Sequence, residues 1–190
     1  GGGTDLPSFF AEEEGFVLSA AIDKHVWLLV STGFQEGIRL KHLAWEEVAD
    51  PADVEHPILR VALGEHWNGD PLELASVADV PAGTGLGSSG AYAVCAVRAL
   101  SGLAGAELAE AACRLEIDLL GRTVGKQDQY TAVHGGINAL TFHPDSVSVR
   151  PLSLPAESSD ALRERFLLFF TGGSRSASRV LSDQVNRTLA

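Results

Sequence analysis

Alternation of apolar and polar positions predicts extended structure in five segments: residues 15–30, 38–43, 72–80, 137–142 and 147–154. The alternation is weak in the first segment and most regular over 72–80. The last two segments flank a turn at His143, Pro144 and Asp145, which predicts a hairpin. A continuous apolar run over 166–171 is typical of a buried strand.

Helical spacing of apolar residues predicts helices over residues 53–67, 91–100, 106–120, 128–133 and 176–189. Asp53 is placed to cap the first of them. The pattern is strongest over 106–120, where one face carries Leu108, Ala112, Leu115 and Leu119. Because the expected strands and helices come in mixed order, the chain is predicted to be α+β rather than a regular βαβ series.

Composition indicates an ordinary globular protein: 45% of the 190 residues are hydrophobic and 21% are charged. The net charge of −11 argues against nucleic acid as a partner, although a local site can still bind a nucleotide. No apolar stretch reaches the roughly 20 residues needed to span a bilayer, and no signal peptide is recognisable. We therefore expect no membrane contact and a cytoplasmic location. The oligomeric state is left open.

The most informative segment is a glycine-rich loop before the predicted helix 91–100: Pro81-Ala82-Gly83-Thr84-Gly85-Leu86-Gly87-Ser88-Ser89-Gly90-Ala91. Glycines allow close approach of the backbone to an anion, and a helix start attracts negative charge. A dinucleotide fold would need a strand about 20 residues on that ends in an acid, but residues 100–115 have a helical pattern. Two interpretations remain: a structural turn, or a triphosphate loop whose serine hydroxyls bind phosphate or Mg²⁺.

Four segments of the chain resemble motifs of the GHMP kinases, which include galactokinase, homoserine kinase and mevalonate kinase. The glycine-rich loop resembles the second motif of that family, and Gly125-Lys126-Gln127-Asp128-Gln129-Tyr130 resembles the segment with its catalytic aspartate. Gly1-Gly2-Gly3-Thr4-Asp5-Leu6-Pro7 is similar to the sugar-binding first motif of the heptose-phosphate kinase branch, close to fucokinase. Residues 171–178 also resemble that branch. The resemblance therefore covers nearly the whole chain.

The resemblance implies the N-terminal domain of GHMP kinases, whose fold is like domain 2 of ribosomal protein S5: a mixed or antiparallel sheet covered by helices. It implies ATP-dependent phosphorylation of D-glycero-D-manno-heptose 7-phosphate at the anomeric O1, with Mg²⁺ as cofactor. A fucokinase- or galactokinase-like kinase of an unphosphorylated sugar and a non-catalytic sugar- or nucleotide-binding module are alternatives.

Both ends of the chain depart from the family pattern. The sequence has no methionine and begins with three glycines, so we expect residues 1–190 to be one domain truncated at both ends. The basic residue of the family's opening strand and the family's C-terminal domain, with its third glycine-rich motif, are absent from this sequence. Whether residues 1–190 are active by themselves is left open.

By the same resemblance, Asp128 takes the catalytic position, and Ser89 with Glu116 binds Mg²⁺. An aspartate can orient or deprotonate a sugar hydroxyl, but Asp128 also suits a helix cap. For Glu116 the alternative is a solvated helix charge. Asp118 projects about 200° away from Glu116 around the helix, so both cannot face one site.

The remaining candidate residues bind the nucleotide or the sugar. The nucleotide residues implied are Pro81, Gly83, Gly85, Leu86, Gly87, Ser88, Ser89 and Gly90. The sugar residues implied are Gly3, Thr4, Asp5 and Arg175. Asp5 is equally typical of a turn, and Arg175 of a protein surface. A guanidinium among serines at a helix start suits a phosphate already on the substrate.

Overall fold

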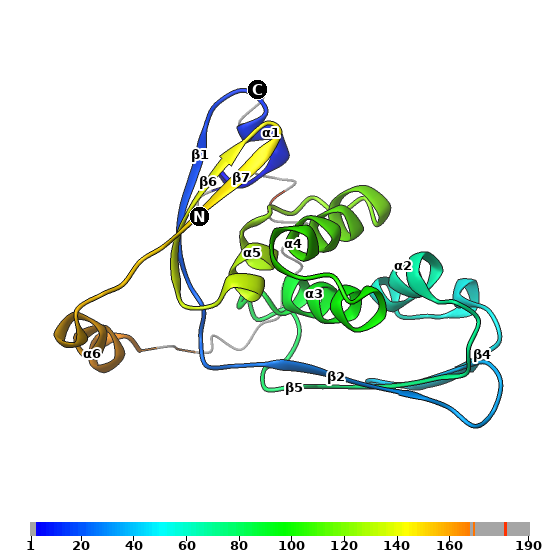
Figure 1. The fold of residues 1–190 in the computed structure, drawn as a ribbon. Helices are drawn as coiled ribbons and strands as arrows, with labels where there is room; N and C mark the ends of the chain where they lie inside the picture. The colour runs from blue at the N-terminus through cyan, green and yellow to red at the C-terminus, as the bar shows by residue number, and fades with distance from the viewer. Residues whose placement is uncertain (1–2, 168, 170–180, 182–190) are drawn as a thin grey trace.

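The chain folds into two β-sheets and a set of packed helices (Figure 1). The computed structural model describes residues 3–167, 169 and 181. One sheet is antiparallel, in the order β1-β6-β7, and comprises β1 (Gly15–Ala20), β6 (Ile137–His143) and β7 (Ser146–Pro151). The other has the order β2-β5-β3-β4 and comprises β2 (Val26–Thr32), β5 (Leu72–Ala78), β3 (Ile38–Lys41) and β4 (Trp45–Val48). Only its β3–β5 pair is parallel, so the predicted α+β class with mixed and antiparallel sheets is confirmed.

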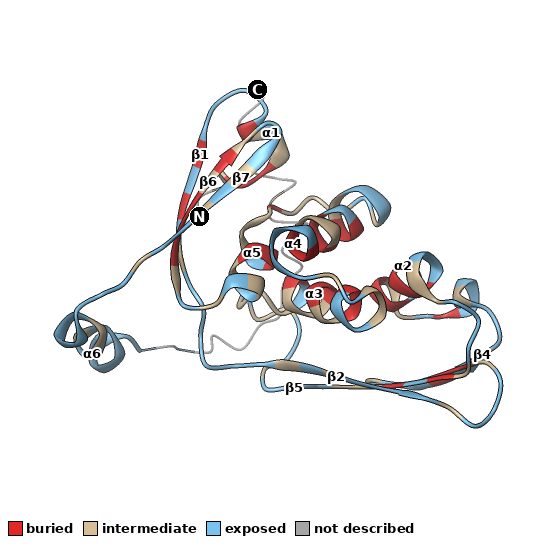
Figure 2. Cartoon of the chain, in the orientation of Figure 1, coloured by how far each residue is buried: buried red, intermediate tan, exposed pale blue. Residues whose placement is uncertain are grey.

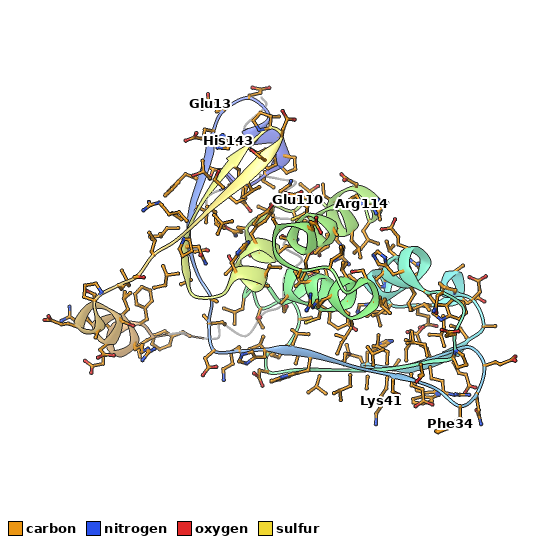
Figure 3. All side chains as sticks on the ribbon, in the orientation of Figure 1. Glu13, Phe34, Lys41, Glu110, Arg114 and His143 are labelled. Atoms are coloured by element: carbon orange, nitrogen blue, oxygen red, sulfur yellow. The ribbon has the colours of Figure 1, made fainter. Side chains whose placement is uncertain are left out.

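The helices fall into two groups by the sheet that they cover. Against one face of the four-stranded sheet lie α2 (Pro57–His66) and α3 (Ser88–Ser101) (Figure 1). Near the three-stranded sheet lie α1 (Pro7–Phe10), α4 (Gly105–Arg114) and α5 (Gln127–His134). A further helix, α6 (Ala156–Arg165), stands apart and has no buried residue. Lys41 extends from the side of the four-stranded sheet that the helices leave uncovered (Figure 3).

Two clusters of buried apolar residues form the core, and they meet at α4 (Figure 2). The first cluster joins the four-stranded sheet to α2 and α3, and it includes Leu108 and Ala112 of α4. The second joins the three-stranded sheet to α1 and α5, and it includes Ala109 and Cys113 of α4. Val133 of α5 packs against both clusters. The helix α4 is therefore the wall that the two halves share.

Several predicted boundaries are wrong. The segment 15–30 is not one extended run, because β1 and β2 belong to different sheets, and β4 was not predicted at all. Asp53 does not cap α2; it ends a 3₁₀ turn (Pro51–Asp53) that Asp50 caps. The N-cap of α2 is His56, whose ring nitrogen accepts from Leu59 N–H.

The predicted helix 106–120 is interrupted by a π-helical turn, η2 (Leu115–Leu119). A π-turn widens the helix and shifts the residues beyond it around the axis. Leu119, on the predicted apolar face, is 41% exposed, whereas Glu116 is only 1% exposed. The apolar spacing alone does not reveal this change.

Two elements were predicted near the C-terminus, a strand over 166–171 and a helix over 176–189. Where the predicted strand 166–171 is described, it is wrong: Phe166, Leu167 and Phe169 lie outside any strand and are each 76% exposed. Most of the predicted helix 176–189, and Arg175 with its flanking serines, lie outside the described residues. In the part of the chain that is described, no single helix has the length and apolar character to cross a membrane. The segments Ser88–Ser101 and Gly105–Leu119 would meet that test only together, and they are bent by 115°.

Candidate active site

The glycine-rich loop turns the chain from β5 into α3. Gly83, Gly85 and Gly87 have φ values of 76°, 78° and 72°, a region that other residues rarely adopt. Gly87 is the N-cap, so α3 begins at Ser88, three residues before the predicted start, and no side chain caps it. The first N–H groups of a helix have no carbonyl partner within it and carry partial positive charge. This end of α3 is therefore suited to bind an anion.

The other loop residues implied by the resemblance lie around this turn. Pro81 is exposed, Leu86 and Ser88 are half-buried, and Gly90 is buried in the first turn of α3. The Thr84 hydroxyl donates to the Pro81 carbonyl over 3.1 Å, which closes the loop on itself.

Glu116 is the hub of a polar network beneath the start of α3. Its Oε1 accepts from Ser89 Oγ over 2.5 Å and from Arg122 Nη1 over 2.8 Å. Its Oε2 accepts from Gln129 Nε2 over 2.8 Å. The alternative of a solvated helix charge is therefore wrong, because this carboxylate is buried and fully hydrogen-bonded. The structure brings together the two residues expected at the metal position, Ser89 and Glu116.

Asp128 lies in the first turn of α5, packed against the first turn of α3. A Cβ atom on Gly90 would be 2.8 Å from Asp128 Cβ, and one on Gly87 would be 3.2 Å from Asp128 Cγ. The N-cap of α5 is Lys126 and no side chain caps this helix, so the capping alternative for Asp128 is wrong. Glycine at both positions is what lets this carboxylate approach the start of α3.

The pKa of Asp128 is raised to about 6. Partial desolvation against the neighbouring helix is the main cause, and the negative charges of Asp5 and Glu116 add to it. A hydrogen bond from Gln127 lowers the pKa by less than these effects raise it. The residue keeps an exposed surface, so a ligand has access to the carboxylate.

The N-terminal segment carries Asp5 to the same place. Asp5 is 5% exposed, and its Oδ2 accepts from Gln127 N–H over 3.3 Å. Its carboxylate lies against Gly125, where a Cβ atom would be 1.8 Å from Oδ2. Gly3 accepts from Leu6 N–H in the same turn, and the Thr4 hydroxyl donates to the Phe16 carbonyl of β1 over 2.8 Å. Asp5 therefore occupies a turn, as its alternative predicted, and also contacts the segment that bears Asp128.

Two residues of the network were missed at the level of sequence: Arg122 and Gln129. Arg122 contacts both Ser89 Oγ and Glu116 Oε1, and Gln129 is 1% exposed. Gln129 directly follows the predicted catalytic aspartate within the motif at 125–130, and this position was a signal available in the sequence. Nothing in the local sequence distinguishes Arg122 from a surface arginine.

Lys126 and Asp118 lie outside this network. Lys126 pairs with Glu110 of α4, which also accepts from the Tyr130 hydroxyl. Asp118 is exposed and lines a cavity of about 500 Å³ beside α1. Glu110 and Arg114 of α4, labelled in Figure 3, line the same cavity. Asp118 therefore does not compete with Glu116 for one site.

The donor set suits magnesium with phosphate co-ligands. Among the described residues, no group of three or more His, Cys, Asp or Glu side chains is arranged to hold a metal ion. Ser89 Oγ and Glu116 Oε1 instead supply two hard oxygen donors side by side. Magnesium is commonly held by one or two protein carboxylates together with substrate phosphates. The residues present therefore fit this ion.

Substituting Gly90 by Ala should lower kcat by about a hundredfold, because displacing a catalytic group by about 1 Å has effects of that size. The added Cβ would collide with the Asp128 Cβ and must push α5 away from α3. Overpacking of this kind costs about 1–3 kcal/mol of unfolding free energy. Gly64→Ala is the matched control, because a Cβ there meets nothing within 4 Å. Equal kinetics for the two variants would contradict the close-contact role of Gly90.

Residues 56–136 match the family described as the GHMP kinases N terminal domain. The chain is 28% identical over 217 aligned residues to the bifunctional fucokinase/GDP-fucose pyrophosphorylase of Arabidopsis thaliana, covering 100% of this chain and 21% of that protein. It is 34% identical over 115 residues to the D-glycero-alpha-D-manno-heptose 7-phosphate kinase of Campylobacter jejuni, covering 57% of this chain and 34% of that protein.

The fold also has solved counterparts. A D-glycero-D-manno-heptose 1-phosphate kinase from Bacteroides thetaiotaomicron superposes with a TM-score of 0.77 at 25% identity, covering 85% of this chain and 59% of that one. The chain thus spans a fifth to a third of the curated relatives and somewhat more than half of this structural neighbour. The glycine-rich loop, Glu116 and Asp128 all fall within the matched residues 56–136. The part of the chain that holds the candidate site therefore matches the GHMP kinases N terminal domain.

Proposed function

We propose that the protein is an ATP-dependent sugar kinase, and that residues 1–190 form its N-terminal domain, which binds ATP and the sugar. The observation that carries the proposal is the convergence of Ser89, Glu116 and Asp128 at the start of α3, beside the glycine-rich loop. Phosphoryl transfer depends mainly on positioning and charge stabilisation, and this arrangement supplies groups for both.

Each part of the site has a role in this proposal. The loop from Pro81 to Gly90 and the N–H groups of α3 hold the phosphates. Ser89 and Glu116 hold magnesium, which supplies charge neutralisation on the phosphates when it is bound. The helix dipole of α3 stabilises the charge that develops on the transferred group.

Asp128 acts on the sugar hydroxyl. In the transfer, the hydroxyl oxygen forms a bond to the γ-phosphorus and the bond from that phosphorus to the bridging oxygen breaks, which releases ADP. The carboxylate of Asp128 orients the hydroxyl and accepts its proton. With a pKa of about 6, this carboxyl is about nine-tenths ionised at pH 7 and so available to do this.

We propose a heptose 7-phosphate as the sugar, with the anomeric O1 as the acceptor. Gly3, Thr4 and Asp5 hold its hydroxyls, and Arg175 holds the phosphate that it already bears. The Campylobacter jejuni relative supports this assignment by its name. An unphosphorylated sugar is the second candidate, favoured by the fucokinase of Arabidopsis thaliana, which aligns with the whole chain.

Isotope-traced phosphoryl transfer with the full-length protein tests both the activity and the substrate. We expect transfer from ATP to heptose 7-phosphate, with fucose and galactose as much poorer acceptors. Arg175→Ala should raise KM for the sugar phosphate by about tenfold or more, because a charge-assisted hydrogen bond is lost, and should leave KM for a free sugar unchanged. Equal effects on both sugars would contradict the phosphate-binding role. If the protein transferred phosphate to none of these sugars, the kinase proposal would be contradicted and a non-catalytic binding module would be favoured.

A further inference from the structure

Arg122 occupies the oxygens that the proposed function assigns to a metal ion. A single nitrogen of its guanidinium, Nη1, lies 2.9 Å from Ser89 Oγ and 2.8 Å from Glu116 Oε1. A guanidinium has only donors to offer and stays protonated at any physiological pH. It therefore interacts with these two oxygens as a cation does.

The second carboxylate oxygen of Glu116, Oε2, has a different partner from Oε1. Oε2 is bonded to Gln129 Nε2 over 2.8 Å, within the buried side of the network. A divalent ion held by both Ser89 and Glu116 would meet Oε1, because that is the carboxylate oxygen in contact with Ser89 Oγ. Since a guanidinium and a metal ion repel each other and need the same lone pairs, the two are mutually exclusive there.

The position of Arg122 allows it to leave. It lies in the loop between η2 and α5, directly after Gly121, and its backbone N–H donates to the Glu116 carbonyl over 3.0 Å. The side chain is 27% exposed, compared with 2% for Glu116. The guanidinium can therefore reorient by rotation of its own side chain, without any change in α3, α5 or the buried carboxylate.

We propose that Arg122 competes with the divalent cation for Ser89 and Glu116, and that the displaced guanidinium binds a phosphate group of the nucleotide. Its contact with Ser89 places it at the anion-binding end of α3, and an arginine fork matches phosphate oxygens in two-point hydrogen bonds. The inference rests on the proposed function and adds a residue to its nucleotide site. It predicts that removing Arg122 changes metal affinity and nucleotide affinity in opposite directions.

The test measures two affinities of the full-length protein. Mn²⁺ binding without nucleotide is followed by electron paramagnetic resonance, and Mg·ADP binding by isothermal titration calorimetry. Arg122→Met should tighten Mn²⁺ binding by about tenfold and weaken Mg·ADP binding by about tenfold, the scale of one charge-assisted hydrogen bond. Arg114→Met is the matched control: this arginine pairs with Glu65, away from the network, and its loss should change neither affinity.

Arg122→Lys distinguishes competition with the metal ion from a role in which Arg122 only supports Glu116. This variant also provides a test if the methionine variant does not fold. Lysine retains the charge but not the fork, so Mn²⁺ affinity should stay close to that of the unsubstituted protein while Mg·ADP binding weakens. Weaker Mn²⁺ binding in both variants would show that Arg122 only supports Glu116, and would overturn the proposal. Unchanged Mg·ADP binding in both variants would also overturn it. If the unsubstituted protein binds neither probe, the proposed function itself fails, and this inference with it.

Discussion

Replacing Asp128 by Asn should lower kcat by about a thousandfold, within the range that general acid–base groups contribute. Asparagine has the same shape but can neither accept the proton of the sugar hydroxyl nor carry a negative charge. Affinity for Mg·ADP should be retained, since the phosphate-binding end of α3 is untouched. Steady-state kinetics and calorimetry on the full-length protein measure both quantities.

The same substitution should not weaken the fold. Asp128 lies near the charges of Asp5 and Glu116, which raise its pKa, so removing its charge relieves repulsion at pH 7. We therefore expect an unchanged or higher Tm alongside the lost activity. Asp118→Asn, which removes a carboxylate on the opposite side of η2, is the control and should leave kcat unchanged. Wild-type turnover by Asp128→Asn would refute the catalytic assignment.

The pH profile gives a second measure of Asp128. In the proposed mechanism the ionised form is the active one, so kcat/KM should rise with pH through about 6 and level off above 7. The rate should rise with pH because below its pKa the carboxyl of Asp128 is protonated and cannot accept the proton of the sugar hydroxyl. Asp118→Asn should retain this profile.

Glu116→Gln should lower kcat by at least a hundredfold and reduce the unfolding free energy by about 2 kcal/mol. The amide keeps one oxygen, so its NH₂ group must face either Gln129 Nε2 or the pair formed by Ser89 and Arg122, all of which act as donors. If the NH₂ group faces Arg122, two donors oppose each other; if it faces Gln129, the Gln129 amide must turn so that its Oε1, which has no hydrogen-bond partner among the described residues, can accept. In either orientation the bond from Arg122 loses its charge assistance, and the proposed metal site loses the negative charge of Glu116. The Mg²⁺ concentration for half-maximal rate should rise accordingly.

Glu110→Gln separates the two effects of that change. Glu110 also accepts several hydrogen bonds, from Lys126 and Tyr130, but lies outside the proposed site. Its substitution should reduce thermal stability without altering the Mg²⁺ requirement. If Glu116→Gln showed the Mg²⁺ dependence of the unsubstituted protein, Glu116 would not be a metal ligand.

The parts of the site that were predicted from the sequence are those with strong local patterns. Glycines at alternate positions before two serines predicted a phosphate loop or a structural turn, and the structure shows the turn with its positive φ values at the start of α3. The positions of Glu116 and Asp128 depended on resemblance to a family, since a single glutamate or aspartate in a helical pattern is ambiguous. Their metal-binding and catalytic roles remain predictions, whereas their convergence is seen in the structure.

The remaining features depend on contacts between distant segments. The π-turn at Leu115–Leu119 has the same apolar spacing as an α-helix, so the exposure of Leu119 could not be foreseen. Arg122 belongs to the site only because the loop after η2 returns beneath α3. Gly125 is required by the carboxylate of Asp5, a residue far away in the sequence. None of these features leaves a local signature.

The division of the core into two clusters has a consequence for how the domain tolerates mutation. Ser89 lies in the first turn of a helix of one cluster and Asp128 in the first turn of a helix of the other. Under the proposed function, the interior packing therefore sets the spacing between phosphate and acceptor. Val133 touches both clusters and behaves as a spacer between them. Phosphoryl transfer is sensitive to displacements well below the size of a methyl group. If the proposed function holds, selection on this core acts on catalytic alignment as well as on stability, even at residues far from the substrate.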